Sequence, residues 1–298
     1  MHKTLILFTV FLCLLVKTAC CNPEPYKKLT AATDLSTNPH VQCLWMPSKN
    51  AKSSVLIAHG FNVRPEKMSG LIDYYHNQGA DVLLSILEGH HKKSFDIQNL
   101  SGTWYEQIEH CAFQMKKEKP HSSLTFVGFS LGGLLGARLA QEHHHLFHNM
   151  ELLAPAIAIR QLPKLAKYMW ESFHFPTFGE FGYTIHSSIA ARSYHTILNL
   201  QDEFLGNLQK LEHSETHIQI YLHPSDPLIS WSKINTLIKQ PGLAHWEVYD
   251  IRKLGHKKIS TKSIIKHMII DEKTLGEENW GYLKRKFQTH LLRSQSSL

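Results

Sequence analysis

The stretch LTFVGFSLGG, residues Leu124–Gly133, constrains the fold of this 298-residue chain more than any other feature. Five residues suited to a buried strand lead into Gly128-Phe129-Ser130-Leu131-Gly132, and apolar residues at helical spacing follow at once. Glycines on both sides of a serine permit a turn too tight for larger side chains. Such a strand–turn–helix unit lifts its serine out of the sheet, so the pattern predicts that Ser130 stands at a strand end.

Apolar strand patterns alternate with helical patterns along most of the chain. Strands are predicted at residues 41–47, 52–60, 80–87, 123–129, 150–159, 217–226 and 246–256, and helices at 68–79, 104–118, 131–144 and 278–292. This alternation predicts one large α/β domain with a mainly parallel sheet covered by helices on both faces. Ligands gather at the carboxyl ends of such strands, where Ser130, His59 and Asp226 are all expected.

A serine hydroxyl needs a base to take its proton and an acid to orient that base. In chains where the serine stands in a G-x-S-x-G turn between a strand and a helix, the acid follows it and the base comes last. Asp226 comes just after an apolar strand and directly before Pro227. We therefore predict that Asp226, rather than Asp250 in the next strand, is the orienting acid.

The choice of base depends on position, because 22 histidines make any single histidine uninformative. His256 follows the last predicted strand, behind Gly255. His245 precedes that strand, and His267 and His290 lie in or near the C-terminal helical sequence. On this reasoning His256 is predicted to be the base.

A developing oxyanion requires backbone N–H donors. One is expected from Leu131, the residue after the serine, and the other from Phe61 in the loop AHGFN, where His59 is expected to shape the loop. The histidine runs at 90–91 and 143–145 could suggest metal ligands, but the second run follows the helix after Ser130 and is better explained as a solvated helix end. We expect no metal and no cofactor.

The alternation of strands and helices stops between about residues 157 and 211. Six aromatic residues fall within 168–181, and leaving them exposed would be costly, so they must cover an apolar core or a binding pocket. We expect this segment to be a cap inserted over the strand ends. An ordinary surface excursion packed on the sheet is the alternative.

Residues 1–21 combine a basic start, a short apolar run and small residues, which predicts a secretory signal peptide followed by the α/β domain over 22–298. An uncleaved N-terminal anchor is the alternative. Cleavage would remove Lys3 and Lys17 and lower the net charge from +7 to +5.

The positive charge is spread along the chain and the sequence shows no nucleic-acid module, although a mildly positive surface is compatible with contact with an anionic membrane surface. In an oxidising compartment Cys43 and Cys111 form either a disulfide or two free buried thiols.

With these residues in place, the chain resembles the α/β-hydrolase superfamily. The resemblance rests on AHGF, GFSLGG, HPSD and LGH in that order and covers about residues 41–292. Within the superfamily the chain is similar to capped esterases of the monoacylglycerol lipase and carboxylesterase type. That similarity implies an eight-stranded sheet, a cap after the sixth strand and an acyl-enzyme on Ser130.

The sequence therefore predicts a secreted or periplasmic serine esterase or lipase acting on small-molecule or lipid-like carboxylic esters. Acyl transfer or thioester hydrolysis by the same three side chains is an alternative, and so is a non-catalytic binding protein with this fold. A peptidase remains open as well, because one fold supports several chemistries. The oligomeric state is left open by the sequence.

Overall fold

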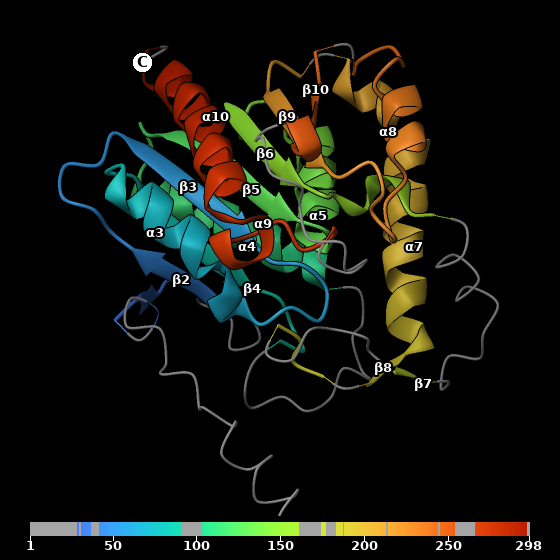
Figure 1. The fold of residues 1–298 in the computed structure, drawn as a ribbon. Coiled ribbons are helices and arrows are strands. Elements are labelled where there is room, and N and C mark those ends of the chain that lie inside the picture. The colour runs from blue at the N-terminus through green and yellow to red at the C-terminus, as the bar shows by residue number, and fades with distance from the viewer. Residues whose placement is uncertain are drawn as a thin grey trace, which may run out of the picture.

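An eight-stranded sheet runs through the middle of the molecule (Figure 1). The computed structural model describes residues 29, 31–36, 42–90, 103–160, 174–176, 183–186, 188–212, 214–243, 245–253 and 266–296. The sheet has the order β1-β2-β4-β3-β5-β6-β9-β10. Its strands are β1 (Thr33–Asp34), β2 (Gln42–Met46), β3 (Ser53–Ala58), β4 (Asp81–Ile86), β5 (Ser123–Phe129), β6 (Asn149–Leu153), β9 (His217–Leu222) and β10 (Glu247–Asp250).

The strands from β4 to β10 in this order run parallel to one another, whereas β2 pairs antiparallel with both β1 and β4. Every residue of β3, β4 and β5 is buried. Continuous burial is expected for parallel strands that helices cover on both faces. The predicted α/β class and the eight-stranded, mostly parallel sheet are confirmed.

Two groups of helices cover the sheet. Figure 1 shows α3 and α10 on one face and α4 and α5 on the other, with α7 and α8 to the side. Their bounds are α3 (Ser69–Asn77), α4 (Trp104–Glu118), α5 (Leu131–Glu142), α7 (Ala191–Gly206), α8 (Trp231–Leu237), α9 (Glu272–Leu275) and α10 (Glu277–Ser296). The predicted helix at 104–118 matches α4 at both ends.

The strand predicted at 150–159 is shorter in the structure, because β6 ends at Leu153. Ala154 has a φ of 43°, and a short 3-10 helix covers Ala156–Ala158. The turn lets the Ala156 N–H donate to the Ser130 carbonyl oxygen at 2.9 Å. The apolar run therefore continues into the segment that supports the serine turn instead of lengthening the sheet.

The segment between β6 and β9 contains the hairpin strands β7 (His174–Pro176) and β8 (Ser188–Ala190), then α7. It leaves the sheet after its sixth strand. Most of the aromatic stretch 168–181 lies outside the described residues, as does the predicted signal peptide at 1–21.

A disulfide joins Cys43 of β2 to Cys111 of α4 across 68 positions of sequence. Both cysteines are fully buried. Of the two alternatives, the structure thus contains the disulfide, which ties the antiparallel side of the sheet to the helix that covers it. Among the described helices, none combines the length and apolar character needed to cross a bilayer.

Candidate active site

Ser130 occupies a strained turn between β5 and α5. Its φ of 50° and ψ of −110° are unusual for a residue with a side chain. Hydrogen bonds hold this conformation, because the Ser130 N–H donates to the Leu153 carbonyl at 2.9 Å and the Ser130 carbonyl accepts from Leu134 at 3.1 Å. A nucleophile elbow holds its serine in such a strained conformation, and here the hydrogen bonds of the neighbouring residues stabilise it.

Close backbone packing explains the glycines around this turn. A Cβ atom on Gly132 would lie 2.4 Å from the Ala58 carbonyl oxygen, which no real side chain tolerates. A Cβ atom on Gly60 would lie 2.7 Å from the Phe129 ring and 3.2 Å from the Ser130 Cβ. Because these two glycines have no side chain, the end of β3 can pack directly against the turn that holds Ser130.

Ser130, His267 and Asp226 form a continuous chain of hydrogen bonds. His267 Nε2 lies 3.1 Å from Ser130 Oγ, and His267 Nδ1 lies 2.8 Å from Asp226 Oδ2. A carboxylate only accepts hydrogen bonds, so the proton of the neutral ring sits on Nδ1 and Nε2 is free to accept from the hydroxyl. The His267 side chain is 8% exposed and its ring centre lies 5.2 Å from that of Phe129.

The histidine in this position differs from the one selected on sequence grounds. His256 lies outside the described residues, and the ring between Ser130 and Asp226 belongs to His267. The sequence pattern places His267 in or near the C-terminal helical sequence, but α9 begins only at Glu272. His267 stands in the turn before that helix, and the buried Ile269 and Ile270 anchor this turn in the core.

Asp226 is fully buried in the loop after β9. Its Oδ1 accepts the backbone N–H groups of Leu228 at 2.7 Å and Ile229 at 2.8 Å, which leaves Oδ2 to His267. The Arg160 Nε donates to the Asp226 carbonyl oxygen at 2.7 Å and braces the loop. The competing carboxylate, Asp250, pairs instead with Arg252 at 2.7 Å.

The two predicted oxyanion donors lie on the segments that flank Ser130. Leu131 is the first residue of α5, a position whose N–H has no partner within the helix. Phe61 follows Gly60, whose backbone packs against Ser130. His59 Nδ1 lies 2.9 Å from the Gly60 carbonyl oxygen, which agrees with the loop-shaping role expected of it.

Residues 183–186, within the insertion, are hydrogen-bonded to the loop that follows β3. The Arg64 N–H donates to the Tyr183 carbonyl at 2.8 Å, and Val63 and Thr184 form an antiparallel bridge. The Tyr183 hydroxyl reaches the other way and donates to Asp271 Oδ2 at 2.7 Å, four positions after His267. Sequence reasoning did not identify Tyr183, because nothing local distinguishes it from the other aromatic residues of the insertion.

A family model described as "Serine aminopeptidase, S33" matches residues 49–232, which is more than half of the chain. The matched range includes Ser130 and Asp226. The chain belongs to this family of α/β hydrolases. No curated protein sequence matches it.

Solved structures share the α/β-hydrolase fold at low sequence identity. A structure from a report on LipS and LipT, two metagenome-derived lipolytic enzymes, has a TM-score of 0.64 and 16% identity, and the match covers 84% of this chain and all of that one. Monoglyceride lipase from Saccharomyces cerevisiae has a TM-score of 0.64 and 15% identity, covering 90% and 98%. Est1E from Butyrivibrio proteoclasticus has a TM-score of 0.60 and 12% identity, covering 89% and 99%.

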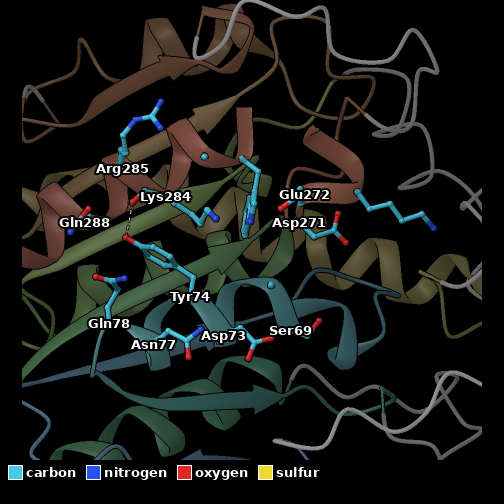
Figure 2. Close-up of a pocket in the computed structure, with 14 residues that line it drawn as sticks. Ser69, Asp73, Tyr74, Asn77, Gln78, Asp271, Glu272, Lys284, Arg285 and Gln288 are labelled. Carbon is cyan, nitrogen blue, oxygen red and sulfur yellow. Dashed lines mark hydrogen bonds between the residues drawn. The ribbon is translucent and has the colours of Figure 1, made fainter. Parts of the chain in front are cut away.

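A separate cavity of this α/β hydrolase lies between α3 and the C-terminal helices (Figure 2). It is an open pocket of about 710 Å³ with both acidic and basic side chains; its lining residues include Asp73, Asp271, Glu272, Lys273, Lys284 and Arg285. The Tyr74 hydroxyl donates to the Lys284 carbonyl at 2.6 Å and links α3 to α10 along one wall. Ser130, Asp226 and His267 are not among its lining residues.

Proposed function

We propose that this α/β hydrolase cleaves carboxylic esters, with Ser130 as nucleophile, His267 as general base and Asp226 as orienting acid. The observation that carries the proposal is the hydrogen-bond chain from Asp226 Oδ2 through His267 to Ser130 Oγ. Lipolytic and esterase neighbours in structure support ester hydrolysis at a general level.

The geometry supports a two-step reaction. His267 Nε2 takes the hydroxyl proton as Ser130 Oγ attacks the ester carbonyl, and the N–H groups of Phe61 and Leu131 receive the oxyanion. The tetrahedral intermediate collapses to an acyl-enzyme while His267 returns its proton to the departing alcohol. Water then attacks the acyl group by the same route and restores the free Ser130.

The substrate's acyl part is proposed to be apolar. Phe61 lies in a cluster of rings, with centroids 5.6 Å from Trp104 and 5.5 Å from Tyr194 of α7. The insertion therefore brings an aromatic side chain to the loop beside Ser130. This contact, and the bonds from residues 183–186 to the same loop, support our proposal that residues 157–211 act as a cap.

Export to an oxidising compartment, secreted or periplasmic, is proposed as well. It is supported by the N-terminal sequence pattern together with the Cys43–Cys111 disulfide, since disulfides persist mainly outside the reducing cytosol. Mass spectrometry of the exported protein tests it. A chain that begins near residue 22 is the expected result, and an intact Met1 in the cytosolic fraction would count against export.

The direct test of ester hydrolysis is turnover of p-nitrophenyl esters with acyl chains of increasing length. We expect turnover that Ser130→Ala abolishes with little loss of folding, and labelling of Ser130 by a fluorophosphonate probe. Parallel assays with acyl thioesters and with aminoacyl p-nitroanilides cover thioester hydrolysis and the peptidase activity that the family description raises. A folded wild type that turns over no ester would reject the proposal.

A further inference from the structure

The peptide bond between Gly60 and Phe61 carries one of the two proposed oxyanion donors. A trans peptide is planar, so its carbonyl oxygen and its N–H point in opposite directions. The direction of the Phe61 N–H is therefore set by whatever holds the Gly60 carbonyl oxygen. That oxygen accepts from two groups, His59 Nδ1 at 2.9 Å and the Val63 N–H at 3.2 Å.

The following peptide is held by a second buried histidine. His90 Nε2 accepts the Asn62 N–H at 2.8 Å, and His90 Nδ1 donates to the Glu88 carbonyl at 3.0 Å. Because the Asn62 N–H can only donate, the ring proton must sit on Nδ1. Asn62 itself has a φ of 56°, a left-handed conformation that needs such external support.

The side chain of Asn62 fixes the loop from the opposite side. Its Oδ1 accepts the His186 N–H at 2.8 Å, and its Nδ2 donates to the His186 carbonyl at 3.0 Å. The His186 ring then donates to the Gly89 carbonyl at 2.8 Å, next to His90. The loop that carries Phe61 is thus clamped between residues 88–90 and residue 186.

Both histidines accept a backbone N–H at Nε2, His59 from Leu87 at 3.1 Å and His90 from Asn62 at 2.8 Å, and a ring can accept there only when it is neutral. His59 and His90 are 0% and 2% exposed, and their ring centres lie 4.7 Å apart. Burial holds the pKa of His90 well below its usual value, and His59 and His186 lower it further, against hydrogen bonds to the backbone of residues 87 and 88. The Trp104 ring, 6.5 Å away, adds no charge. A protonated His90 would present an N–H to the Asn62 N–H and lose this contact.

We propose that His90, acting with His59, is a positioning residue that aims the Phe61 N–H at the oxyanion formed on Ser130. This proposal rests on the proposed ester hydrolysis and gives His59 and the segment after β4 a role in directing the oxyanion donor. His90 touches no reacting atom; it acts through the Asn62 N–H and the peptide before it.

Two substitutions at position 90 separate its two hydrogen bonds. The amide of His90→Gln reaches about as far as Nε2 and retains an acceptor for the Asn62 N–H. The shorter amide of His90→Asn reaches only the Nδ1 position and retains the donor to the Glu88 carbonyl. The variants therefore differ in the contact that the proposal requires.

We expect kcat for a p-nitrophenyl ester to fall about 10- to 100-fold in His90→Asn, because a misdirected N–H donor stabilises the oxyanion of the transition state less. KM should change by less than about twofold, because the interaction is made in the transition state. Inhibition by butylboronic acid, whose serine adduct places an oxygen in the same site, should weaken by the same factor as kcat. His90→Gln should stay within about threefold of wild type in both measurements.

Matched controls distinguish the possible failures. His290→Gln also removes a buried histidine, one paired with Glu151 beneath α10, and should leave kcat and boronic acid affinity per folded molecule unchanged. If wild type turns over no ester, the proposed function fails. If wild type is active and Ser130→Ala is not, but folded His90→Asn matches wild type in kcat and inhibition, the role of His90 fails alone.

A crystal structure of wild type with butylboronic acid bound needs no variant to fold. We expect a boronate oxygen within hydrogen-bonding distance of the Phe61 and Leu131 N–H groups, with His90 Nε2 still accepting from Asn62. A Phe61 N–H turned away from the boronate would overturn the inference.

Discussion

The Nε2 atom of His267 lies 3.1 Å from the Oγ atom of Ser130. The two residues are separated by 137 positions in sequence. His267 can reach Ser130 from the turn that precedes α9, because that helix begins only at Glu272. Asp226 fixes the other side of the ring, so the lone pair on Nε2 points at the hydroxyl.

His267→Ala should lower kcat for a p-nitrophenyl ester at least about 10³-fold, because His267 Nε2 is the base that lies within hydrogen-bonding distance of Ser130 Oγ. His256→Ala is the matched comparison and should retain kcat within about twofold. Both variants are measured beside wild type at pH 7.5 and checked for folding by circular dichroism. The reverse pattern would restore His256 as the base.

The sequence predicts those features of the candidate site that depend on local pattern. Ser130 and Asp226 each follow an apolar strand within a few residues, so the strand pattern fixes their edge of the sheet. His267 was missed because it comes well beyond β10 and no strand or helix pattern identifies its turn. The sequence did contain a signal for this turn, since the buried Ile269 and Ile270 and the helix-capping Asp271 follow two to four positions after His267.

Features that depend on tertiary contacts were also beyond the sequence. The end of β6 at Leu153 reflects the need for the next turn to support Ser130, which apolar composition does not reveal. The contacts of Asn62 with His90 and His186 join segments 28 and 124 positions apart. No propensity or spacing rule connects such residues, so they emerge only from the fold.

Asp226→Asn should reduce kcat by about 10³- to 10⁴-fold while KM changes little. The amide oxygen would still accept the N–H groups of Leu228 and Ile229. The side chain would lose the negative charge that stabilises the imidazolium and that fixes the tautomer of the neutral ring. Asp250→Asn provides the control, because Asp250 pairs with the surface residue Arg252 and should leave kcat within about twofold. Equal losses in both variants would contradict the assignment of the acid.

Removal of the disulfide by Cys43→Ala with Cys111→Ala should lower the free energy of unfolding by about 2–4 kcal/mol. The bond closes a loop of 68 positions and restricts the unfolded chain. The melting temperature should fall by about 5–15 °C, while kcat at 25 °C stays near wild type because neither cysteine contacts the serine turn. Wild type unfolded, refolded and measured in the presence of dithiothreitol, so that both thiols stay free, should show a shift in the same direction. A variant as stable as wild type would contradict the prediction.

Stability should decrease as the pH falls below about 6.5. Burial, with His59 and His186, lowers the pKa of His90, and burial also lowers the pKa values of His148, His223 and His245. In the unfolded chain these rings take up protons near pH 6.5, whereas in the folded protein they remain neutral to lower pH. The unfolded state therefore binds more protons in this range, and folding becomes less favourable as the pH falls.

The contribution of His90 should be fully present above its unfolded pKa and lost as the pH falls from about 6.5 toward its folded pKa. One such histidine changes the free energy of unfolding by at most about 1.4 kcal/mol per pH unit. Urea denaturation at pH 7.5, 6.5, 5.5 and 5.0 should therefore show a shallower pH dependence in His90→Gln than in wild type, because glutamine does not titrate. His148, His223 and His245 contribute equally to both proteins, so the difference reports His90 together with its coupling to His59 and His186. Parallel curves for the two proteins would mean that His90 is not held neutral by the fold.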